Sequence, residues 1–486
     1  MARYAYLSCP ASALAAILGT TVLLAGGQPP ATGAVPGTTW GTARALGLEG
    51  RLIHRVYTSP VLSCPTPANC AVAATTVRRD GRPAPVVATE IRGTWGRAKI
   101  VPGVNALSHR GEAISAGVAC GSAGYCTVAG IYRSPATFTM QPFVATEVHN
   151  VWRDARQLPG IARVDHGRLA WLESLACPAA GSCMVGGYYQ TKSASQAFVA
   201  SQRNGAWGAP RVVPGTAALN VGGLATVFSV ACASPGNCAA VGKFAPATST
   251  GYPNSQPFVA SEVHGTWHSA IPISLPAGPG EIYAELNSAS CGKPGNCAAA
   301  GTFADASGSH AFVVSEVNGT WGTATIVPAD AASSQITQFT GSDAVACAPR
   351  GGCTVGGSYR DLAGHRQAFM VSSGPDGSWG PAMQVPGTGA LNTRGEATVE
   401  AVSCASPGNC VLGGYYKNAL RFQAFVATQV NGTWNPAVEV PGTPVLNTAG
   451  SAAVTWLSCR QPGRCTASGY YSDRHFSSWI YVVSQR

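Results

Sequence analysis

The feature that most constrains the fold of this chain is a set of eight cysteine pairs, in each of which the two cysteines are six positions apart. Successive pairs follow one another at intervals of 55 to 59 residues. A fixed period of this size indicates that one supersecondary unit is repeated along the chain. The pairs are Cys64 with Cys70, Cys120 with Cys126, Cys177 with Cys183, Cys232 with Cys238, Cys291 with Cys297, Cys347 with Cys353, Cys404 with Cys410, and Cys459 with Cys465.

A second set of landmarks recurs in step with the cysteines. A Gly-Gly-Tyr-Tyr element follows the second cysteine at 186–189 and 413–416, and a Gln-Ala-Phe-Val element follows at 196–199 and 423–426. One tryptophan closes each period: Trp40, Trp95, Trp152, Trp207, Trp267, Trp321, Trp379 and Trp434. Each unit therefore contains the same ordered series of elements.

Each unit is predicted to form four short strands. The first strand runs up to the first cysteine, and a tight turn such as Pro235-Gly236-Asn237 leads into the second. The third strand is the Ala-Phe-Val run, and a turn such as Asn318-Gly319 leads into a strand that begins at the tryptophan. No helical period is visible. Four strands in a unit of this length are typical of a propeller blade.

The two ends of the chain indicate how the ring closes. The last unit has its cysteines and a third strand at 479–484, but the chain stops at Arg486 before any tryptophan strand. The missing strand is supplied near the N-terminus, where 37–46 includes Trp40. Closure hides sheet edges that an open solenoid would expose. We therefore expect an all-β fold, a single eight-bladed propeller over 35–486, in preference to an open solenoid or two four-bladed propellers.

The cysteine pairs are expected to be disulfides. Opposite positions of a β-hairpin come close enough in space for a disulfide. A row of zinc sites is the alternative, but zinc needs four ligands and no histidine recurs at a fixed offset from the pairs. We expect one short disulfide per blade, no metal and no cofactor.

The N-terminus reads as a secretory signal. Arg3 precedes an apolar run at about 13–25 and a stretch of small residues that ends at Ala34, so residues 1–34 are predicted to be a signal peptide. We expect a secreted, extracellular protein with no transmembrane segment after the signal is removed. The patterned cysteines agree with an oxidising compartment. The net charge of +10 suits an anionic partner, although solubility explains it equally well.

The order of a diglycine-tyrosine, an aromatic-bearing strand and a tryptophan strand resembles the kelch repeat. The diglycine is complete at 186–187, 356–357 and 413–414, and kelch units lack the cysteine pair. The whole pattern is similar to uncharacterised secreted repeat proteins of actinobacteria with Ser-Cys-x-Ser-x-Gly-x-Cys units. The sialidase Asp-box is a weaker match, because 373–379 has the residues but not the spacing. These resemblances imply a propeller fold, and they do not indicate an activity.

Three consecutive units depart from the repeat just before their first strand. Units four and eight have the plain sequences 218–223 and 445–450 at this place, whereas units one to three have histidine and arginine. In a ring these side chains would share one sector of the rim, among the long connections. Charged surface loops without a function are the alternative. The candidate ligand-binding residues are His54, Arg55, His109, Arg110, Glu112, Asp165, His166 and Arg168.

A second group lies four residues before the first cysteine: Glu173, Asn287, Asp343 and Glu400, with Glu285 nearby. Paired carboxylates at one height of the channel suit acid–base cleavage of a glycoside, for which Glu173, Asp343 and Glu400 are the catalytic candidates. Hydrogen bonding between the inner strands is the structural alternative. The repeated tyrosines, such as Tyr188 and Tyr415, suit either sugar stacking or packing between blades.

Two classes of function fit these observations. One is an extracellular binding propeller for an anionic glycan or cell-envelope component, and near-uniform blades favour it. The other is a glycan-cleaving enzyme, either a polysaccharide lyase with histidine as base or a glycoside hydrolase. No sequence motif is specific enough to decide whether the protein is an enzyme. We expect a monomer and no nucleic-acid partner.

Overall fold

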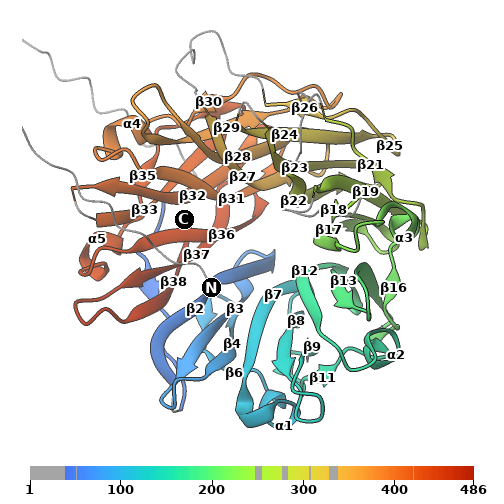
Figure 1. Cartoon of the computed structure of the whole chain (residues 1–486). Coiled ribbons are helices and arrows are strands. Elements are labelled where there is room, and N and C mark those ends of the chain that lie inside the picture. The colour runs from blue at the N-terminus through green and yellow to red at the C-terminus, as the bar shows by residue number, and fades with distance from the viewer. Residues whose placement is uncertain are drawn as a thin grey trace, which may run out of the picture. The chain divides into compact units, whose positions relative to one another are not determined.

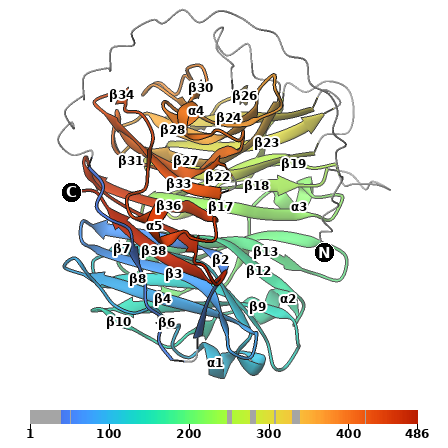
Figure 2. The same cartoon turned by 90° about the vertical axis from the view of Figure 1, so that its left-hand side faces the viewer.

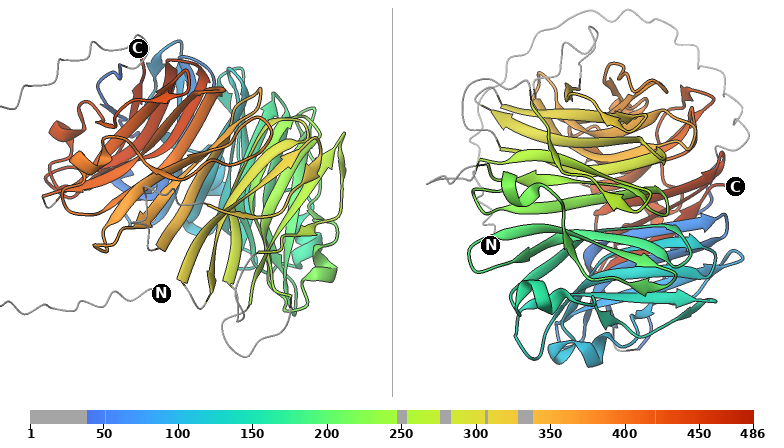
Figure 3. Two further views of the ribbon diagram at one scale, coloured as in Figure 1. Left: turned by 90° about the horizontal axis from the view of Figure 1, so that it is seen from above. Right: turned by 90° about the vertical axis from the view of Figure 1, so that its right-hand side faces the viewer.

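Eight antiparallel sheets follow one another around a ring, one for each cysteine pair (Figure 1). The computed structural model describes residues 39–50, 52–246, 254–275, 283–305, 308–327, 338–419 and 421–486, with the backbone alone at 338–343. The predicted signal peptide lies outside the described residues. The views in Figures 2 and 3 show the same succession of blades from the side and from above.

Each blade begins with its innermost strand and moves outward through two further strands. The innermost strands are β2 (Leu52–Thr66), β7 (Ala113–Ser122), β12 (Ala170–Ala179), β17 (Ala225–Ser234), β22 (Tyr283–Lys293), β27 (Gln338–Cys347), β31 (Ala397–Ser406) and β36 (Ala452–Gln461). The second strands are β3 (Asn69–Arg78), β8 (Tyr125–Arg133), β13 (Ser182–Gln190), β18 (Asn237–Phe244), β23 (Asn296–Asp305), β28 (Cys353–Arg360), β32 (Asn409–Asn418) and β37 (Arg464–Ser472). The third strands are β4 (Pro83–Ile91), β9 (Met140–Val148), β14 (Ser195–Arg203), β19 (Gln256–Val263), β24 (Gly308–Val317), β29 (Arg366–Ser372), β33 (Arg421–Val430) and β38 (Ser478–Ser484).

The outermost strand is broken in most blades, whereas the sequence predicts a continuous one. In blade five, Trp321 pairs with Glu316 and Thr325 pairs with Val313, so the outer strand has one residue more than its partner and bulges between the two pairs. The outer segments are β5 (Thr94–Trp95) and β6 (Lys99–Ile100), β10 (Val151–Trp152) and β11 (Arg156–Gln157), β15 (Ala206–Trp207) and β16 (Arg211–Val212), β20 (Thr266–Trp267) and β21 (Ile271–Pro272), β25 (Thr320–Trp321) and β26 (Thr325–Ile326), β30 (Met383–Gln384), β34 (Thr433–Trp434) and β35 (Val438–Glu439), and β1 (Arg44–Ala45).

The connections between blades contain one-turn helices, which the sequence does not predict because a single turn leaves no period. Three of the α-helices repeat one local design: a glycine with positive φ precedes the first turn, as at Gly215 with φ 81°, and the hydroxyl of Thr216 donates to the carbonyl of Val213 over 2.7 Å. The helices are α1 (Val104–Leu107), the 3-10 helix η1 (His109–Gly111), α2 (Ile161–Asp165), α3 (Thr216–Leu219), α4 (Thr388–Leu391) and α5 (Thr443–Leu446).

The N-terminal strand completes the last blade, as predicted. Arg44 and Ala45 of β1 pair with Val482 and Tyr481 of β38, and Trp40 forms a bridge with Gln485. The innermost strand of blade eight, β36, contacts β2 of blade one in the same way as other neighbouring blades meet. In Figures 1 and 2 the red β36–β38 accordingly lie beside the blue β2 and β3. The ring is therefore closed, and the prediction for 37–46 is confirmed over its described part, 39–46.

All eight predicted disulfides are present, each within one blade, and none joins two blades. The bonds link Cys64 to Cys70, Cys120 to Cys126, Cys177 to Cys183, Cys232 to Cys238, Cys291 to Cys297, Cys347 to Cys353, Cys404 to Cys410, and Cys459 to Cys465. In each bond the two Cα atoms are 3.9 to 4.2 Å apart, at the end of the hairpin that joins the first and second strands.

These sixteen cysteines have a structural role. Closing so short a loop stabilises the fold by roughly 2–2.5 kcal/mol in the chain-entropy model. The second cysteine of each pair is part of the second strand or lies at its start, and seven of the eight are buried: Cys70, Cys126, Cys183, Cys238, Cys297, Cys410 and Cys465. The disulfides therefore pin each blade at the hairpin that joins its first and second strands.

The diglycine of the repeat is explained by a β-bulge in the innermost strand. In blades two to eight, the residue four positions before the first cysteine has no partner on the second strand, as Glu173 does between the pairs Leu172–Gly187 and Ser174–Gly186. The bulge turns the carbonyl of Trp171 toward Gly187, where any Cβ atom would collide with it. Gly130, Gly242, Gly301, Gly414 and Gly469 face the equivalent carbonyl in their own blades.

Neighbouring blades are held together by apolar side chains and by serine hydroxyls. One core cluster, for example, packs Val199 of blade three against Val227 and Phe258 of blade four. On the innermost strands, the hydroxyl of Ser174 accepts a hydrogen bond from the backbone N–H of Val230 in the next blade over 3.0 Å. Ser458 of blade eight accepts from Cys64 of blade one in the same manner, also over 3.0 Å. The closing interface thus uses the same contacts as the others.

Candidate functional site

The ring has two unlike faces. One, the turn face, carries the two hairpin turns of each blade. In blade one these turns lie together, and the N–H of Gly93 donates to the carbonyl of Ala68. The other, the connection face, carries the loops between second and third strands and the links from blade to blade. All eight rim candidates lie on the connection face, where loops on a rigid frame vary most.

In blade one the candidates sit on an insertion in the innermost strand. Ile53 pairs with Val77 and Thr58 pairs with Thr75, so the four residues 54–57 of β2 lie opposite a single residue of β3. The insertion exposes Arg55 and leaves the side chain of Tyr57 60% exposed. This protrusion is specific to blade one among the described blades.

His54 faces the closing interface of the ring instead of open solvent. Its imidazole stacks on the indole of Trp479 in blade eight, with ring centroids 3.3 Å apart. Burial lowers the pKa of His54, and the charge of Arg97 lowers it further, against the opposing charge of Asp473. The imidazole is therefore held neutral at pH 7 and is available as a base or an uncharged hydrogen-bonding group.

In blade two the candidates have separate roles. His109 contacts Phe138 edge-on, with ring centroids 5.0 Å apart, and Arg110 is exposed with φ 51°. Glu112 is bound through both oxygens by Arg133, at 2.8 and 3.2 Å. Its charge is thus compensated inside the blade, and Glu112 is a structural partner of Arg133.

In blade three Asp165 organises the connection. It is fully buried, and it accepts hydrogen bonds from Gln141 Nε2 over 2.7 Å and from the N–H of Gly167 over 2.9 Å. His166, with φ 51°, and Arg168 project on either side of that turn and are exposed. Asp165 therefore fixes the turn that carries His166 and Arg168, and is itself removed from solvent.

On the connection face of blades one to three, the exposed arginines are not balanced by carboxylates. Asp80 is paired with Arg82 at 3.2 Å, Glu112 is paired with Arg133, and Asp165 is buried. Glu49 is exposed where the chain enters blade one. Five exposed arginines of blades one to three, which we call the basic sector, make no ion pair with any described residue: Arg55, Arg79, Arg110, Arg163 and Arg168.

The structure does not join the three histidines into one pocket. His54 contacts blade eight, His109 contacts the loop of its own blade, and His166 stands at the entrance of blade three. They lie at three successive blade entrances around the rim. This arrangement suits an extended ligand that spans several blades better than a single enclosed substrate.

The carboxylate candidates occupy the bulge position of their innermost strands. Glu173 and Glu400 belong to blades three and seven, which are four blades apart in a ring of eight, so they do not form an acid–base pair. Asp343 also occupies a bulge, but its side chain lies outside the described residues. Asn287 takes the same position in blade five.

Glu173 has the environment of a proton donor. Burial raises its pKa to about 7, and it has no hydrogen bond or ion pair with the described residues. Its charge contributes to raising the pKa of Tyr188, which is itself raised mainly by burial. Glu400 acts in the same way on Tyr470 of blade eight. The second tyrosines, Tyr189 and Tyr416, are buried between blades and have packing roles.

One polar cluster is not anticipated by the sequence. Lys243 Nζ donates to Glu285 Oε2 over 2.8 Å and to Tyr283 Oη over 2.7 Å, between blades four and five. The sequence does contain a sign of this cluster, because Lys243 stands where other units have the first tyrosine of the Gly-Gly-Tyr element. The carboxylate of Glu285 is therefore paired inside this cluster.

In the described part of the chain, no group of three or more histidine, cysteine, aspartate or glutamate side chains is arranged to hold a metal ion. Among the same residues, no helix is long and apolar enough to span a bilayer.

Neither a scan against protein-family models nor a search of curated proteins finds a match for this chain. Among solved structures, a protein of unknown function from Dyadobacter fermentans is 11% identical, with 93% of this chain and 100% of that chain covered and a TM-score of 0.41. A polysaccharide lyase described as an ulvan lyase is 11% identical, with coverages of 92% and 96% and a TM-score of 0.43. The Aleuria aurantia lectin, a six-bladed propeller, is 14% identical, with coverages of 68% and 97% and a TM-score of 0.31. Similarities this low carry no argument about function.

Proposed function

We propose that this chain is an extracellular binding protein whose propeller holds an anionic glycan, or another anionic component of a cell envelope, on the basic sector. The observation that carries the proposal is the charge imbalance there. The nearby carboxylates Asp80 and Glu112 are bound by Arg82 and Arg133, and Asp165 is buried, while five arginines stay exposed. An uncompensated cluster of this kind attracts polyanions.

The chemistry of the sector suits carboxylate or sulfate groups. A guanidinium binds either anion through two parallel hydrogen bonds. Arg55, Arg110 and Arg168 stand at the entrances of three successive blades, so a polymer with regularly spaced charges would meet several weak contacts at once, which multiplies its affinity. The exposed ring of Tyr57 offers a surface for the C–H face of a sugar.

The rest of the proposal concerns the cellular setting. We infer that residues 1–34 are a cleaved signal peptide and that the mature chain is a secreted monomer. Eight disulfides agree with an oxidising compartment. The resemblance to kelch repeats and to secreted actinobacterial repeat proteins belongs to this inference as well.

A glycan-cleaving enzyme is the second candidate, and one observation favours it. Glu173 has a pKa of about 7 and no partner among the described residues, which is the state required of a general acid at neutral pH. A hydrolase would use Glu173 alone with a group from the substrate, since Glu400 lies across the ring. A lyase would use the neutral His54 beside Arg55.

Binding to polygalacturonate and to heparin, followed by biolayer interferometry, tests the proposal. Simultaneous Arg55→Ala, Arg110→Ala and Arg168→Ala changes should weaken binding by more than about tenfold, or ~1.4 kcal/mol. Binding by the unchanged protein should weaken strongly between about 50 and about 500 mM salt. Retained affinity in the triple variant, or affinity independent of salt, would show that the basic sector is not the site.

A matched control removes three exposed cations from the turn face: Lys293→Ala, Arg350→Ala and Arg464→Ala. This variant has the same net charge as the first and should bind normally. Release of unsaturated or reducing products from either polymer, abolished by Glu173→Gln or His54→Ala, would replace the binding proposal with the enzyme.

A further inference from the structure

At several interfaces between blades, the indole N–H of the repeat tryptophan donates a hydrogen bond to a hydroxyl of the preceding blade, a contact that we call the clasp. In blade two, the indole N–H of Trp152 donates to the hydroxyl of Thr89 in blade one over 3.0 Å. That hydroxyl in turn donates to Glu147 Oε1 of blade two over 2.9 Å. Blade five repeats the arrangement on blade four, where Ser261 accepts from Trp321 over 2.8 Å and donates to Glu316 over 2.7 Å. In blade six, Trp379 donates to Ser315 over 3.0 Å.

The clasp is missing between blades two and three, as it is at Trp40 and Trp267, whose indole Nε1 atoms are likewise buried without a hydrogen-bond partner among the described residues. Trp207 and the hydroxyl of Thr146 are present at the equivalent positions, and Gln202 takes the place of the glutamate, as Gln429 and Gln485 do in blades seven and eight. The amide of Gln202 turns away and donates to the carbonyl of Gly205 over 3.1 Å. The indole Nε1 of Trp207 is buried and has no hydrogen-bond partner among the described residues.

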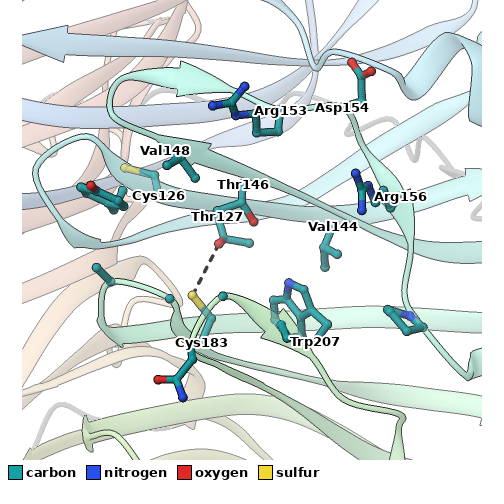
Figure 4. A pocket seen from close by; sticks show the side chains of 17 residues that line it. Cys126, Thr127, Val144, Thr146, Val148, Arg153, Asp154, Arg156, Cys183 and Trp207 are labelled. Atoms are coloured by element: carbon teal, nitrogen blue, oxygen red, sulfur yellow. Dashed lines mark hydrogen bonds between the residues drawn. The ribbon is translucent and has the colours of Figure 1, made fainter.

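A cavity takes the place of the missing clasp. It measures about 560 Å³, whereas the clasped interface between blades five and six leaves about 30 Å³. Figure 4 shows its walls: the indole of Trp207 lies opposite Thr127, Thr146 and Val144, and Arg153 and Arg156 come from the outer strand of blade two. Both arginines are exposed, and neither makes an ion pair within the described chain.

We propose that this cavity binds one acidic sugar unit, a uronic or sialic acid at the end of a glycan, as a second site separate from the basic sector. A sugar ring offers a flat C–H face to the indole and to Val144, and hydroxyls to Thr127 and Thr146. Its carboxylate matches the charge of Arg153 and Arg156, which exceeds that of Asp154 at the same rim. The volume is within the range of small-ligand sites, roughly 300–1,000 Å³.

The site lies beside the hairpin turns of blades two and three, since Gly181 and Gly205 also line it. It therefore opens away from the connection face that carries the basic sector. A glycan could engage either site without the other. The two proposals consequently respond to different substitutions, and the failure of one leaves the other standing.

Saturation-transfer NMR and calorimetry with the methyl glycosides of glucuronic acid, galacturonic acid and N-acetylneuraminic acid test the site. Methyl glucoside serves as the neutral sugar, and a blocked Glu-Glu dipeptide serves as the acidic peptide. We expect saturable binding of at least one acidic sugar, weakened about tenfold or more by Arg156→Ala and by Trp207→Phe, which reduces the aromatic face in the cavity.

Lys99→Ala is the matched control, because Lys99 occupies the position of Arg156 in blade one, where Trp152 closes the interface. This variant should bind as the unchanged protein does. The proposal is overturned if no acidic sugar binds in the millimolar range, if the dipeptide binds in preference, or if Arg156→Ala and Trp207→Phe leave the affinity intact. Unaltered melting temperatures in both variants ensure that lost affinity reports on the site.

Discussion

The imidazole of His54 lies flat on the indole of Trp479, with ring centroids 3.3 Å apart and ring planes inclined by 14°. His54 belongs to the first blade and Trp479 to the last. Trp479 is held at its edge, because its Nε1 donates to Asp473 Oδ2 over 2.9 Å. The contact thus joins the two ends of the chain and places a neutral histidine at the edge of the basic sector.

This contact should make the stability of the ring sensitive to mild acid. Burial lowers the pKa of His54 in the native state, so the unfolded chain takes up its proton at a higher pH. The contribution of His54 to stability is therefore full above the ordinary histidine pKa and is lost as the pH falls below it. Between about pH 8 and 5, the free energy of unfolding should fall further for the unchanged protein than for His54→Phe, as measured in urea. Equal falls would contradict this, and His268→Phe, at an exposed site, is the control.

Ring closure should depend on the buried face of the N-terminal strand. Leu46 is 2% exposed and packs against Ile480 and Val482 of the last blade. Leu46→Ala should lower the free energy of unfolding by about 2–5 kcal/mol, because it leaves a cavity at the closing interface. Val445→Ala, at a side chain that is 80% exposed, should change it by less than about 0.5 kcal/mol. Similar denaturation midpoints for the two variants would mean that the ring does not rely on this strand.

The glycine opposite each bulge should not tolerate a methyl group. A Cβ atom at Gly187 would collide with the carbonyl of Trp171, so Gly187→Ala must flatten the bulge that carries Glu173. We expect a loss of about 1–3 kcal/mol or more in chemical denaturation. At Gly208 a Cβ atom would meet only the carbonyl of Ser201, 3.5 Å away, so Gly208→Ala should be mild. A Gly187→Ala protein as stable as Gly208→Ala would disprove the steric explanation.

The clasp between blades one and two should be visible as a stability difference between two tryptophans. Trp152→Phe and Trp207→Phe remove the same atoms, but only Trp152 donates a hydrogen bond, to Thr89. Trp152→Phe should therefore cost about 1 kcal/mol more than Trp207→Phe in the free energy of unfolding. Equal costs would show that the indole N–H of Trp152 contributes nothing.

The sequence was sufficient to predict the blades, because the residues that determine them are close together in the chain and recur in every unit. A cysteine pair six residues apart closes a hairpin within itself, and the strand order of one unit predicts that of the next. Trp40 at one end and the truncated unit at the other also identified the closing strand without a structure. The break in the outer strand and the one-turn helices were not predicted, because an extra residue after Trp321 or a single turn at Thr216 leaves no periodic signal.

The state of each candidate side chain was decided by the tertiary structure, because its partners come from distant parts of the chain. Glu112 and Asp165 carry the same formal charge in the sequence, yet one is bound by Arg133 and the other is buried against Gln141. Glu173 and Glu400 share a position in the repeat, and the ring then sets them on opposite sides. The unpartnered Nε1 of Trp207 appears only in the structure, because Trp152, Trp321 and Trp379 take their hydrogen-bond partner from the preceding blade. Contacts between neighbouring blades join residues about 55 positions apart, and no local pattern encodes which of them is left without a partner.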